Sequence, residues 1–342
     1  METMKAAVLE EFFKPLVLKE VALPVPGPGE VRIRVRATGL CASDLHIQEG
    51  MIKTVTLPHI LGHEVAGVVE SLGDGVTNLA VGAHVVVGID ITCKTCDYCR
   101  TGRGNLCKSL TRVGFERDGG YAPYLVVPRD SVYEIDPKVP FEQAAVIPDA
   151  VACMYHAIKT QAKLFPGSRV CILGMGGLGF QGIQIAKLFG AKVYCTSRQD
   201  PKLELAREFG ADGVINTKTQ DLVEEIYKLT DGEMCDVVFD NIGIEDSIMQ
   251  SLNCCKPGGK AIIVGYSTPT FTVEYQDIMK LEKEIIGMRG STGQDLVESI
   301  RFVEEGAITP FIYKTYPFTE VNEALQDLAE GKSMGRTVIT FD

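Results

Sequence analysis

The chain has 342 residues, a length that predicts two domains of ordinary size. Hydrophobic residues make up 45% and charged residues 23%, which excludes a wholly disordered chain. A net charge of −11 argues against nucleic acid or an anionic membrane as the main partner. No stretch approaches the roughly 20 apolar residues of a membrane span. We therefore expect neither nucleic acid nor a membrane as a partner.

The chain is rich in cysteine, with 11 cysteines against five histidines. An odd total would leave one thiol over in a fully paired disulfide framework. The start, Met1–Lys5, leads into a mixed segment with Glu10 and Glu11 and not into an apolar signal sequence. We therefore expect a cytoplasmic protein, in which clustered thiols more often bind metal or carry out chemistry than crosslink.

The first 150 residues are typical of a β domain. Short strands are predicted at residues 5–9, 30–37, 65–70, 85–91 and 124–127, with Pro, Gly and Asp between them. Residues 30–37 alternate strictly between apolar and polar, as a half-buried strand does. Many short strands with turn signals indicate a compact barrel or sandwich.

Strands and helices alternate after residue 150. Strands are predicted at residues 169–174, 192–196, 213–215, 235–239, 260–264 and 284–287, and helices at 179–189, 201–209 and 222–229. This alternation predicts right-handed βαβ units and a parallel sheet. Beyond residue 290, the pattern predicts helices at 294–305 and 320–329 and a closing strand at 336–341.

A glycine-rich loop follows the apolar run 169–174. Its sequence is Gly174-Met175-Gly176-Gly177-Leu178-Gly179, which fits G-x-G-x-x-G between a strand and a helix. Glycines permit a tight turn and let the backbone approach a pyrophosphate at the helix N-terminus. The alternative is a glycine-rich turn that binds nothing, and the strand–loop–helix context disfavours it.

The end of the next strand indicates which dinucleotide binds. An acidic residue there would bind the ribose hydroxyl of NAD, but residues 192–196 lead into Ser197 and Arg198, with Lys202 one helical turn later. A hydroxyl and two cations would bind a 2′-phosphate that a carboxylate would repel. We therefore predict NADP(H) over NAD(H), the alternative being that Arg198 and Lys202 are ordinary surface charges.

Four cysteines lie within 15 residues. Cys93, Cys96, Cys99 and Cys107 form the pattern C-x2-C-x2-C-x7-C. Four thiolates can close a tetrahedral zinc site with no open position, which is a structural site. The alternatives are four unliganded thiols, or an iron–sulfur cluster, whose motif would place a proline after the last cysteine.

A second, open metal site is suggested by Cys41, His63 and Asp149. Cys, His and Asp are zinc ligands that would leave a fourth position for water or substrate. Each residue also has a structural interpretation: a buried thiol, a core histidine, and a helix N-cap. Because the three positions are far apart, spacing alone does not join them.

The sequence resembles the zinc-containing medium-chain alcohol dehydrogenases over essentially the whole chain. The resemblance is carried by residues 39–46, residues 61–69, the four-cysteine segment, the glycine-rich loop, and Gly335-Arg336. It implies an α/β protein with two domains. These are a GroES-like β-barrel catalytic domain, residues 1–150 with a C-terminal return at 290–342, and a Rossmann coenzyme domain with a doubly wound parallel sheet, residues 151–289.

The resemblance also implies roles for particular residues. Cys41, His63 and Asp149 would bind a catalytic zinc, Glu64 would lie beside it and ligate it transiently, and Asp44 would orient His63. Ser43 would take the alcohol proton, and His46 would pass it to solvent. With the four-cysteine site, this gives two zinc ions per chain. Gly174, Gly176, Gly177, Leu178, Gly179, Ser197, Arg198, Lys202, Gly265, Ser291 and Arg336 would contact the cofactor.

The implied function is a zinc-dependent alcohol dehydrogenase, transferring hydride reversibly between a small alcohol and its aldehyde or ketone with NADP(H), as a homotetramer. A polyol dehydrogenase of the sorbitol type is the near alternative, although its third ligand is more often Glu. A non-enzymatic NADP-binding protein is the alternative from another class. The chain has Cys153-Met154-Tyr155 where the family often has Thr-Gly-Tyr, and candidate substrate-pocket walls are Ile52, Leu57, Phe115 and Ser291.

Overall fold

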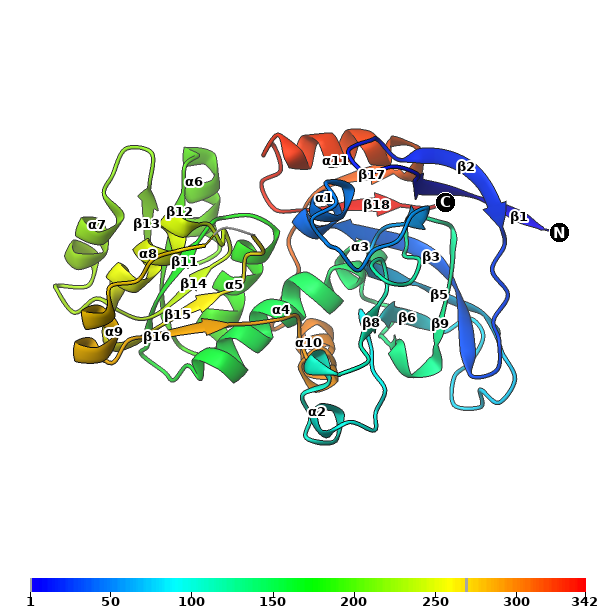
Figure 1. Ribbon diagram of the computed structural model, residues 1–342, viewed down its shortest axis with the longest axis horizontal. Coiled ribbons are helices and arrows are strands. Elements are labelled where there is room, and N and C mark those ends of the chain that lie inside the picture. Colours follow the sequence, from blue (N-terminus) through cyan, green and yellow to red (C-terminus); the bar gives the residue numbers. More distant parts are fainter. Residues whose placement is uncertain (1, 268–269) are drawn as a thin grey trace. The chain divides into compact units, whose positions relative to one another are not determined.

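The computed structural model describes residues 2–267 and 270–342, without the side chain of residue 277. The chain divides into two compact units (Figure 1). The first unit comprises Met1–Ala152 and Ser291–Asp342, and the second comprises Cys153–Gly290. No helix in the described residues is long and apolar enough to cross a membrane.

The first unit is built mainly from β-strands. Its strands are β1 (Thr3–Leu9), β2 (Val17–Ala22), β3 (Glu30–Leu40), β4 (His59–Ile60), β5 (Glu64–Leu72), β6 (His84–Val87), β7 (Asp90–Ile91), β8 (Thr111–Arg112), β9 (Tyr124–Pro128), β10 (Val132–Glu134), β17 (Ile312–Pro317) and β18 (Arg336–Thr340). They form a three-stranded sheet, β2-β1-β4, a seven-stranded sheet, β10-β6-β5-β3-β18-β17 with β9 on β3, and a β7–β8 pair.

Strand β3 organises the larger sheet. Its alternation places Val31, Ile33 and Val35 in a buried cluster with the apolar side chains of β5, β6 and β9. The closing strand β18 pairs antiparallel with β3, so that Thr337 lies opposite Leu40. This pairing brings the end of the chain to the strand end that precedes Cys41.

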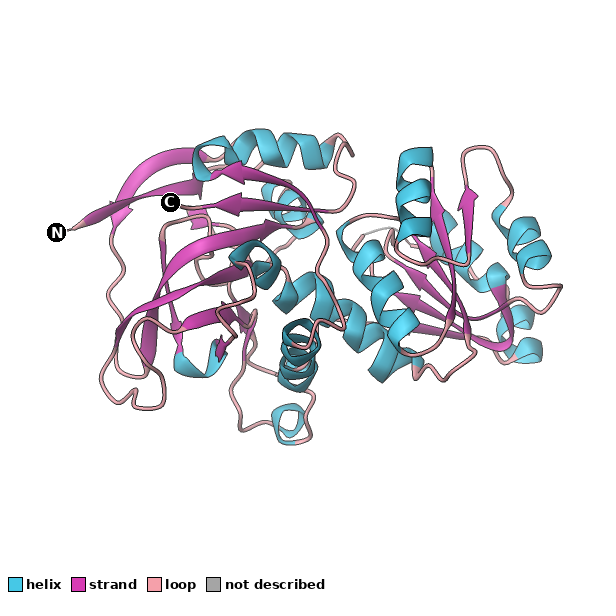
Figure 2. Ribbon diagram, turned by 180° about the vertical axis from the view of Figure 1, so that it is seen from behind, coloured by secondary structure: helices cyan, strands magenta, loops and turns pink. Residues whose placement is uncertain are grey.

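Helices cover parts of this unit. They are α1 (Ala42–Gln48), α2 (Asp97–Arg100), α3 (Phe141–Ala145), α10 (Gly293–Glu304) and α11 (Val321–Ala329). Short 3-10 turns lie at Gly104–Leu106, Arg129–Ser131 and Phe318–Glu320. In Figure 2, α11 runs alongside the strands at the C-terminal end of the chain, and its buried residues join a core cluster with β1, β4 and α1.

A helical run that the sequence pattern did not predict follows α3. Two π-helical segments, Ile147–Val151 and His156–Ala162, flank α4 (Ala152–Tyr155). Asp149 lies inside the first π-helical segment. The interpretation of Asp149 as a helix N-cap is therefore wrong, because the helical backbone begins before it.

The second unit contains a parallel six-stranded sheet (Figure 2). Its strands are β11 (Arg169–Leu173), β12 (Lys192–Ser197), β13 (Gly213–Asn216), β14 (Cys235–Asp240), β15 (Cys255–Ile263) and β16 (Glu284–Gly287), in the order β13-β12-β11-β14-β15-β16. Its helices are α5 (Gly177–Leu188), α6 (Asp200–Glu208), α7 (Leu222–Leu229), α8 (Glu245–Cys254) and α9 (Tyr275–Leu281).

The sheet order gives this unit its ligand-binding geometry. After β13 the chain crosses to β14, which lies on the far side of β11 from β12. The crossover makes the carboxyl ends of β11 and β14 a topological switch point, where open α/β sheets bind their ligands. The strand–helix alternation predicted this sheet, although the sequence pattern missed α8 and α9.

One predicted strand is divided in two. Residues 85–91 were expected as a single strand, but β6 ends at Val87 and β7 begins at Asp90. At the break, the N–H of Gly88 donates to the carbonyl of Ser131 at 2.7 Å. The sequence pattern also missed β2, β17 and the short helix α1, which carries Ser43, Asp44 and His46.

Candidate functional site

Four side chains converge in the first unit. Cys41, His63, Glu64 and Asp149 each offer a ligand atom, and these atoms all lie within 4.8 Å of one another. Cys41 ends β3 and caps α1, His63 and Glu64 stand at the start of β5, and Asp149 comes from the π-helical segment. The sheet therefore joins positions that spacing alone left apart.

The donor chemistry fits zinc. A thiolate, an imidazole and a carboxylate are ligands that Zn²⁺ takes in tetrahedral sites. The His63 Nε2 and the Asp149 Oδ2 are 3.8 Å apart, about 0.5 Å more than two tetrahedral ligands that each lie about 2 Å from one ion. Cys41, His63 and Glu64 are buried, so their polar atoms need a partner of opposite charge.

Asp44 lies beside the Nδ1 of His63, the ring nitrogen that does not face Asp149. Its carboxylate is fully buried, and its Oδ1 lies 3.5 Å from the His63 Nδ1. Its Oδ2 accepts the N–H of Cys41 at 2.9 Å. One carboxylate thereby orients the imidazole of His63 and holds the backbone of Cys41, as carboxylates behind metal-binding histidines commonly do.

Tyr121 is a functional residue that the sequence reasoning missed. Its side chain is fully buried, and its hydroxyl donates to the Asp44 Oδ2 at 2.9 Å. Tyr121 precedes β9 and is 77 residues from Asp44 in the chain. No local pattern could have joined the two, although a tyrosine directly after Gly119-Gly120 could have been noted.

Arg336 is buried against the same cluster. Its guanidinium lies 2.5 Å from the Glu64 Oε1 and 2.8 Å from the Asp149 Oδ2. It also donates to the carbonyl of Leu40 at 3.2 Å. The assignment of Arg336 to the cofactor stays a prediction; in the structure, its hydrogen bonds and ion pairs join three segments that carry candidate metal ligands.

Glu64 needs space that only glycine leaves. Gly39 lies opposite Glu64 in the β3–β5 pairing. A Cβ atom at Gly39 would overlap the Glu64 carboxylate. The glycine in the segment 39–46 therefore allows a carboxylate to approach the backbone of β3 at the cluster.

The charges of the cluster are strongly coupled. Burial disfavours ionised Asp149, but hydrogen bonding to His63 and the charge of Arg336 outweigh it and lower the pKa of Asp149. Burial raises the pKa of Glu64 well above its usual range, against the attraction of Arg336. Burial opposes protonation of His63, yet Asp44 and Asp149 hold the pKa of His63 well above its ordinary value. Without a metal, the cluster therefore holds protons on His63 and Glu64, and a divalent cation would take their place.

The residues expected to move a proton lie on α1. The Ser43 Oγ is 3.6 Å from the Cys41 Sγ, so the hydroxyl stands beside the candidate ligands. His46 follows one turn later on the same helix and is half-buried. Burial lowers the pKa of His46, which keeps its imidazole neutral near pH 7.

The four-cysteine lobe forms a second cluster. The sulfurs of Cys93, Cys96, Cys99 and Cys107 lie within 4.8 Å of one another, with separations of 3.5 Å (Cys96–Cys99), 3.9 Å (Cys93–Cys99) and 4.0 Å (Cys96–Cys107). A tetrahedron with zinc–sulfur bonds of about 2.3 Å has sulfurs about 3.8 Å apart. The geometry fits a closed metal site.

Hydrogen bonds favour the thiolate form of Cys93 and Cys96, whereas burial and the neighbouring thiols raise the pKa of Cys99 to about 11. The N–H of Cys96 donates to the Cys93 Sγ at 3.4 Å, and the Thr95 hydroxyl lies 3.6 Å from the same sulfur. These donors, with Thr95 the largest contributor, lower the pKa of Cys93 to about 5. None of the described cysteines forms a disulfide, and the six outside both clusters lie in the second unit.

The glycine-rich loop has the form that a pyrophosphate requires. Gly174 directly follows β11 with a φ of +88°, a conformation that favours glycine. Gly176 caps α5 without a side chain, so the first N–H groups of the helix face no capping oxygen. A Cβ at Gly179 would lie 2.5 Å from the carbonyl oxygen of Gly174, so glycine allows close helix–strand packing there.

The residues expected to choose the dinucleotide lie at the end of β12. Ser197 is the last residue of the strand, and its Oγ accepts the N–H of Gln199 at 3.1 Å. Arg198 is exposed, and Lys202 is half-buried, which lowers the pKa of its ammonium group. The nearest acidic residue along the chain, Asp200, accepts a hydrogen bond from the side chain of Asn216 at 2.6 Å.

Gly265 lies at the neighbouring carboxyl end of β15. Its N–H donates to the carbonyl of Asp240 at 2.9 Å. A Cβ at this position would lie 2.5 Å from the carbonyl carbon of Ile242. The structure thus brings Gly265 beside the end of β14, at the edge of the sheet where Gly174 also lies.

The structure places the four predicted substrate-pocket walls in two different surroundings. The ring of Phe115 lies 5.0 Å from that of His63, and Ile52 and Leu57 pack against the core cluster that contains Phe115. Ser291 instead lines a cavity of about 550 Å³ beside the four-cysteine lobe, together with Cys99 and Tyr133.

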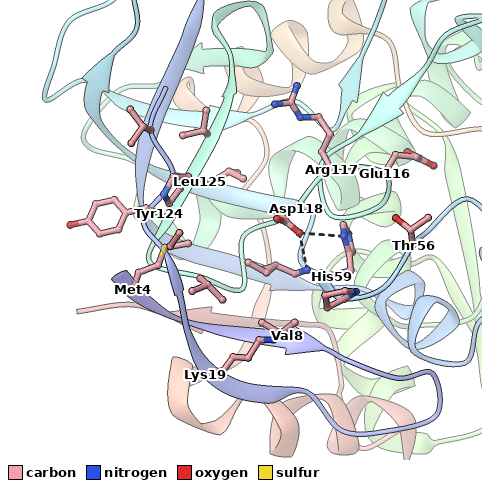
Figure 3. A pocket seen from close by; sticks show the side chains of 18 residues that line it. Met4, Val8, Lys19, Thr56, His59, Glu116, Arg117, Asp118, Tyr124 and Leu125 are labelled. Atoms are coloured by element: carbon pink, nitrogen blue, oxygen red, sulfur yellow. Dashed lines mark hydrogen bonds and ion pairs between the residues drawn. The ribbon is translucent and has the colours of Figure 1, made fainter. Parts of the chain in front are cut away.

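A larger cavity of about 790 Å³ lies elsewhere in the first unit (Figure 3). Its walls come from β1, β2, β4, β9 and the loop 116–119. His59 is buried in its lining, and the His59 Nδ1 lies 3.3 Å from the Asp118 Oδ1. The lining does not include Cys41, His63 or Asp149, so this cavity is separate from the candidate metal centre.

Comparisons with known proteins agree with this architecture. Residues 27–137 match the family model of the alcohol dehydrogenase GroES-like domain, and residues 177–305 match that of the zinc-binding dehydrogenases. An alcohol dehydrogenase of Geobacillus stearothermophilus is 37% identical over 99% of this chain and 100% of its own length.

Solved structures show the same likeness. One described as an NAD-dependent alcohol dehydrogenase has a TM-score of 0.94 and 30% identity, covering 99% of this chain and 100% of its own. A zinc-binding dehydrogenase from Sinorhizobium meliloti 1021 bound to NADP has a TM-score of 0.93 and 30% identity, covering both chains completely.

A GroES-like domain, a Rossmann-type parallel sheet and two candidate zinc sites define a zinc-binding dehydrogenase. The chain belongs to the zinc-containing medium-chain dehydrogenase/reductase family, the family of the zinc-binding alcohol dehydrogenases. The expected fold class and family are therefore confirmed.

Proposed function

We propose that this protein is an NADP(H)-preferring, zinc-dependent alcohol dehydrogenase that interconverts small alcohols and their aldehydes or ketones. The convergence of Cys41, His63 and Asp149, with Glu64 and the supporting Asp44, carries the proposal. A zinc ion held by a thiolate, an imidazole and a carboxylate keeps an open position for substrate. The curated relative from Geobacillus stearothermophilus, an alcohol dehydrogenase, supports the substrate class.

The chain's own residues would prepare the chemistry. Zinc would supply Lewis acidity toward the substrate oxygen, and the dinucleotide would accept or donate the hydride. Asp44 holds the His63 ring in place through its Nδ1 and leaves Nε2 facing the other candidate ligands. Arg336 holds Asp149 and Glu64, and so limits repulsion between the two carboxylates.

Proton transfer would use α1. The Ser43 hydroxyl stands beside Cys41 and would accept the alcohol proton at Oγ while giving up its own. His46 would receive that proton on its neutral imidazole and release it to solvent. The lowered pKa of His46 supports this role, because the ring is ready to accept a proton at pH 7.

Preference for NADP(H) is the finer part of the proposal. It is supported by Ser197 and Arg198 at the end of β12, where a carboxylate would favour NAD, and by Lys202 on α6. One solved relative is bound to NADP and another is described as NAD-dependent, so the family includes both.

The test measures kcat/KM for a panel of primary, secondary and polyhydric alcohols with both cofactors. We expect oxidation of simple alcohols with NADP⁺ preferred at least about tenfold, because each charge-assisted phosphate contact strengthens binding. Replacing Ser197→Asp together with Arg198→Ala should shift the preference toward NAD⁺. An unchanged preference would place the 2′-phosphate elsewhere, and preferred oxidation of polyols would favour the sorbitol-type alternative.

The assembly and compartment belong to the same proposal. We propose a homotetramer in the cytoplasm, as the family resemblance and the free thiols suggest. Light scattering on the purified protein should give four times the mass of one chain. A dimer would contradict the assembly without affecting the proposed chemistry.

A further inference from the structure

Asn241 stands at the switch point of the parallel sheet. It directly follows β14, and its N–H donates to the carbonyl of Leu173, the last residue of β11, at 3.2 Å. A Cβ atom placed at Gly174 would lie 3.9 Å from the Cβ of Asn241. The side chain is therefore a direct neighbour of the glycine-rich loop, in the second unit.

The side-chain amide of Asn241 has no hydrogen-bond partner in the described part of the chain. Both Oδ1 and Nδ2 are buried, and neither has a hydrogen-bond partner among the described residues. Burying an amide without partners costs free energy, so such groups in folded proteins commonly face a ligand or water.

The polar groups on both sides of Asn241 in the chain already have hydrogen-bond partners. The N–H groups of Ile242 and Gly243 donate to the Asp240 Oδ1 at 2.8 and 3.0 Å, and the Ser247 hydroxyl donates to the Asp240 Oδ2 at 2.7 Å. Asp240 thus organises the turn after β14 without the Asn241 side chain. The amide is not needed to shape this turn.

We propose that the amide of Asn241 hydrogen-bonds the nicotinamide-side ribose of the bound dinucleotide. Ser197, the expected contact of the adenosine ribose, ends β12 on one side of β11, whereas Asn241 ends β14 on the other side. A dinucleotide that crosses the switch point with its pyrophosphate at α5 places its second ribose over β14. An amide offers both a donor and an acceptor, which suits vicinal hydroxyl groups.

A neighbouring apolar side chain supports this orientation. Ile242 is 43% exposed, and its Cγ1 would lie 3.1 Å from a Cβ at Gly174. An exposed aliphatic side chain at the loop offers a surface on which a sugar or a planar ring can pack. The proposal rests on the proposed function, because it requires that a nicotinamide dinucleotide binds.

The test uses Asn241→Leu, which keeps the shape of the side chain and removes both polar atoms. Binding of NADPH and NADH to the zinc-loaded full-length protein is followed by nicotinamide fluorescence, since the chain has no Trp to interfere. Binding of adenosine 2′,5′-bisphosphate, which lacks the nicotinamide half, is followed by calorimetry. Thermal midpoints are measured without nucleotide.

The expected result separates binding from stability. Asn241→Leu should weaken NADPH binding about tenfold, as the loss of a buried hydrogen-bond partner does, and leave the bisphosphate affinity unchanged. Its thermal midpoint should stay the same or rise, because an unsatisfied amide is removed. A matched control, Asn216→Leu, should lower the midpoint, because the Asn216 amide donates to Asp200 at 2.6 Å and accepts the N–H of Lys218 at 3.0 Å.

Three results would overturn the proposal. Unchanged NADPH binding would show that the amide does not touch the dinucleotide. Equal weakening for the bisphosphate would place the contact on the adenosine half. A midpoint lowered as in Asn216→Leu would assign Asn241 a structural role. A wild-type protein that binds dinucleotide but oxidises no alcohol would contradict the proposed function alone and leave this contact testable.

Discussion

The hydroxyl of Tyr121 donates a 2.9 Å hydrogen bond to the Oδ2 of Asp44, and both side chains are fully buried. Asp44 in turn lies against the His63 Nδ1 through its other oxygen. The tyrosine therefore restrains the carboxylate that orients a candidate zinc ligand. Such outer contacts commonly change metal affinity by about 10- to 100-fold when they are removed.

Replacing Tyr121→Phe should loosen the catalytic zinc without unfolding the protein. We expect loss of one zinc per chain to a chelator to accelerate about tenfold, because Asp44 loses a charge-assisted partner. The cobalt-substituted variant should also show a shifted visible absorption band, which reports the ligand field. Tyr194→Phe is the matched control, because its hydroxyl bonds the Leu229 carbonyl at 3.1 Å in the second unit. Zinc retention like that of the wild type would show that Asp44 orients His63 without the hydrogen bond from Tyr121.

The two zinc sites should be separable by substitution. Metal analysis of the wild-type protein should find two zinc ions per chain, and Cys41→Ser or Cys99→Ser should each remove one. Cys41→Ser should abolish turnover and keep the thermal midpoint within a few degrees, whereas Cys99→Ser should lower the midpoint, because a closed site stabilises its own loop. Detection of a single zinc in the wild type would remove one of the two assignments.

Arg336 should contribute most to the free energy of unfolding when zinc is absent. Replacing Arg336→Met leaves the fully buried carboxyl group of Glu64 and the partly buried one of Asp149 without their cation, and breaking a buried ion pair commonly costs about 3–5 kcal/mol. Urea unfolding of the zinc-free protein should show a loss of this order, and the zinc-loaded protein a smaller loss, because the metal supplies positive charge. Arg301→Met, at an exposed Arg301–Glu305 pair, should change neither state. Equal losses with and without zinc would show that Arg336 acts through packing.

Stability should fall on acidification partly through His59. Burial lowers the pKa of His59 below its ordinary value, although Asp118 and Glu116 oppose this shift. The unfolded chain therefore binds a proton below about pH 6.5 that the folded chain does not, and the free energy of unfolding decreases as the pH falls through that range. Urea unfolding at pH 7.5 and 5.5 should show a smaller decrease for His59→Gln than for the wild type. An identical decrease would assign the acid sensitivity to other groups.

Local sequence determined much of this protein. The glycine-rich loop, the alternation of strands and helices from Arg169 to Gly287, and the four-cysteine spacing are short-range patterns, and each is found as a local structure. They predicted the parallel sheet, the form of the dinucleotide loop and the closed thiol cluster. The pattern failed for the helical run 147–162, because its π-helical turns do not follow the spacing of an α-helix.

Only the tertiary structure brought the open metal site together. Cys41, His63 and Asp149 come from three separate segments: the pairing of β3 with β5 brings Cys41 close to His63, and Asp149 reaches them from the π-helical segment. The pairing of β3 with β18 delivers Arg336 from the end of the chain, and Tyr121 reaches Asp44 across 77 residues. The sequence pattern did not single out Asn241 either, because the neighbours of a residue at a strand end depend on which strand lies beside it. Several buried polar groups of this site have partners from distant segments, because strand pairing brings those segments together; a single sequence therefore shows the candidate residues but not which of them meet.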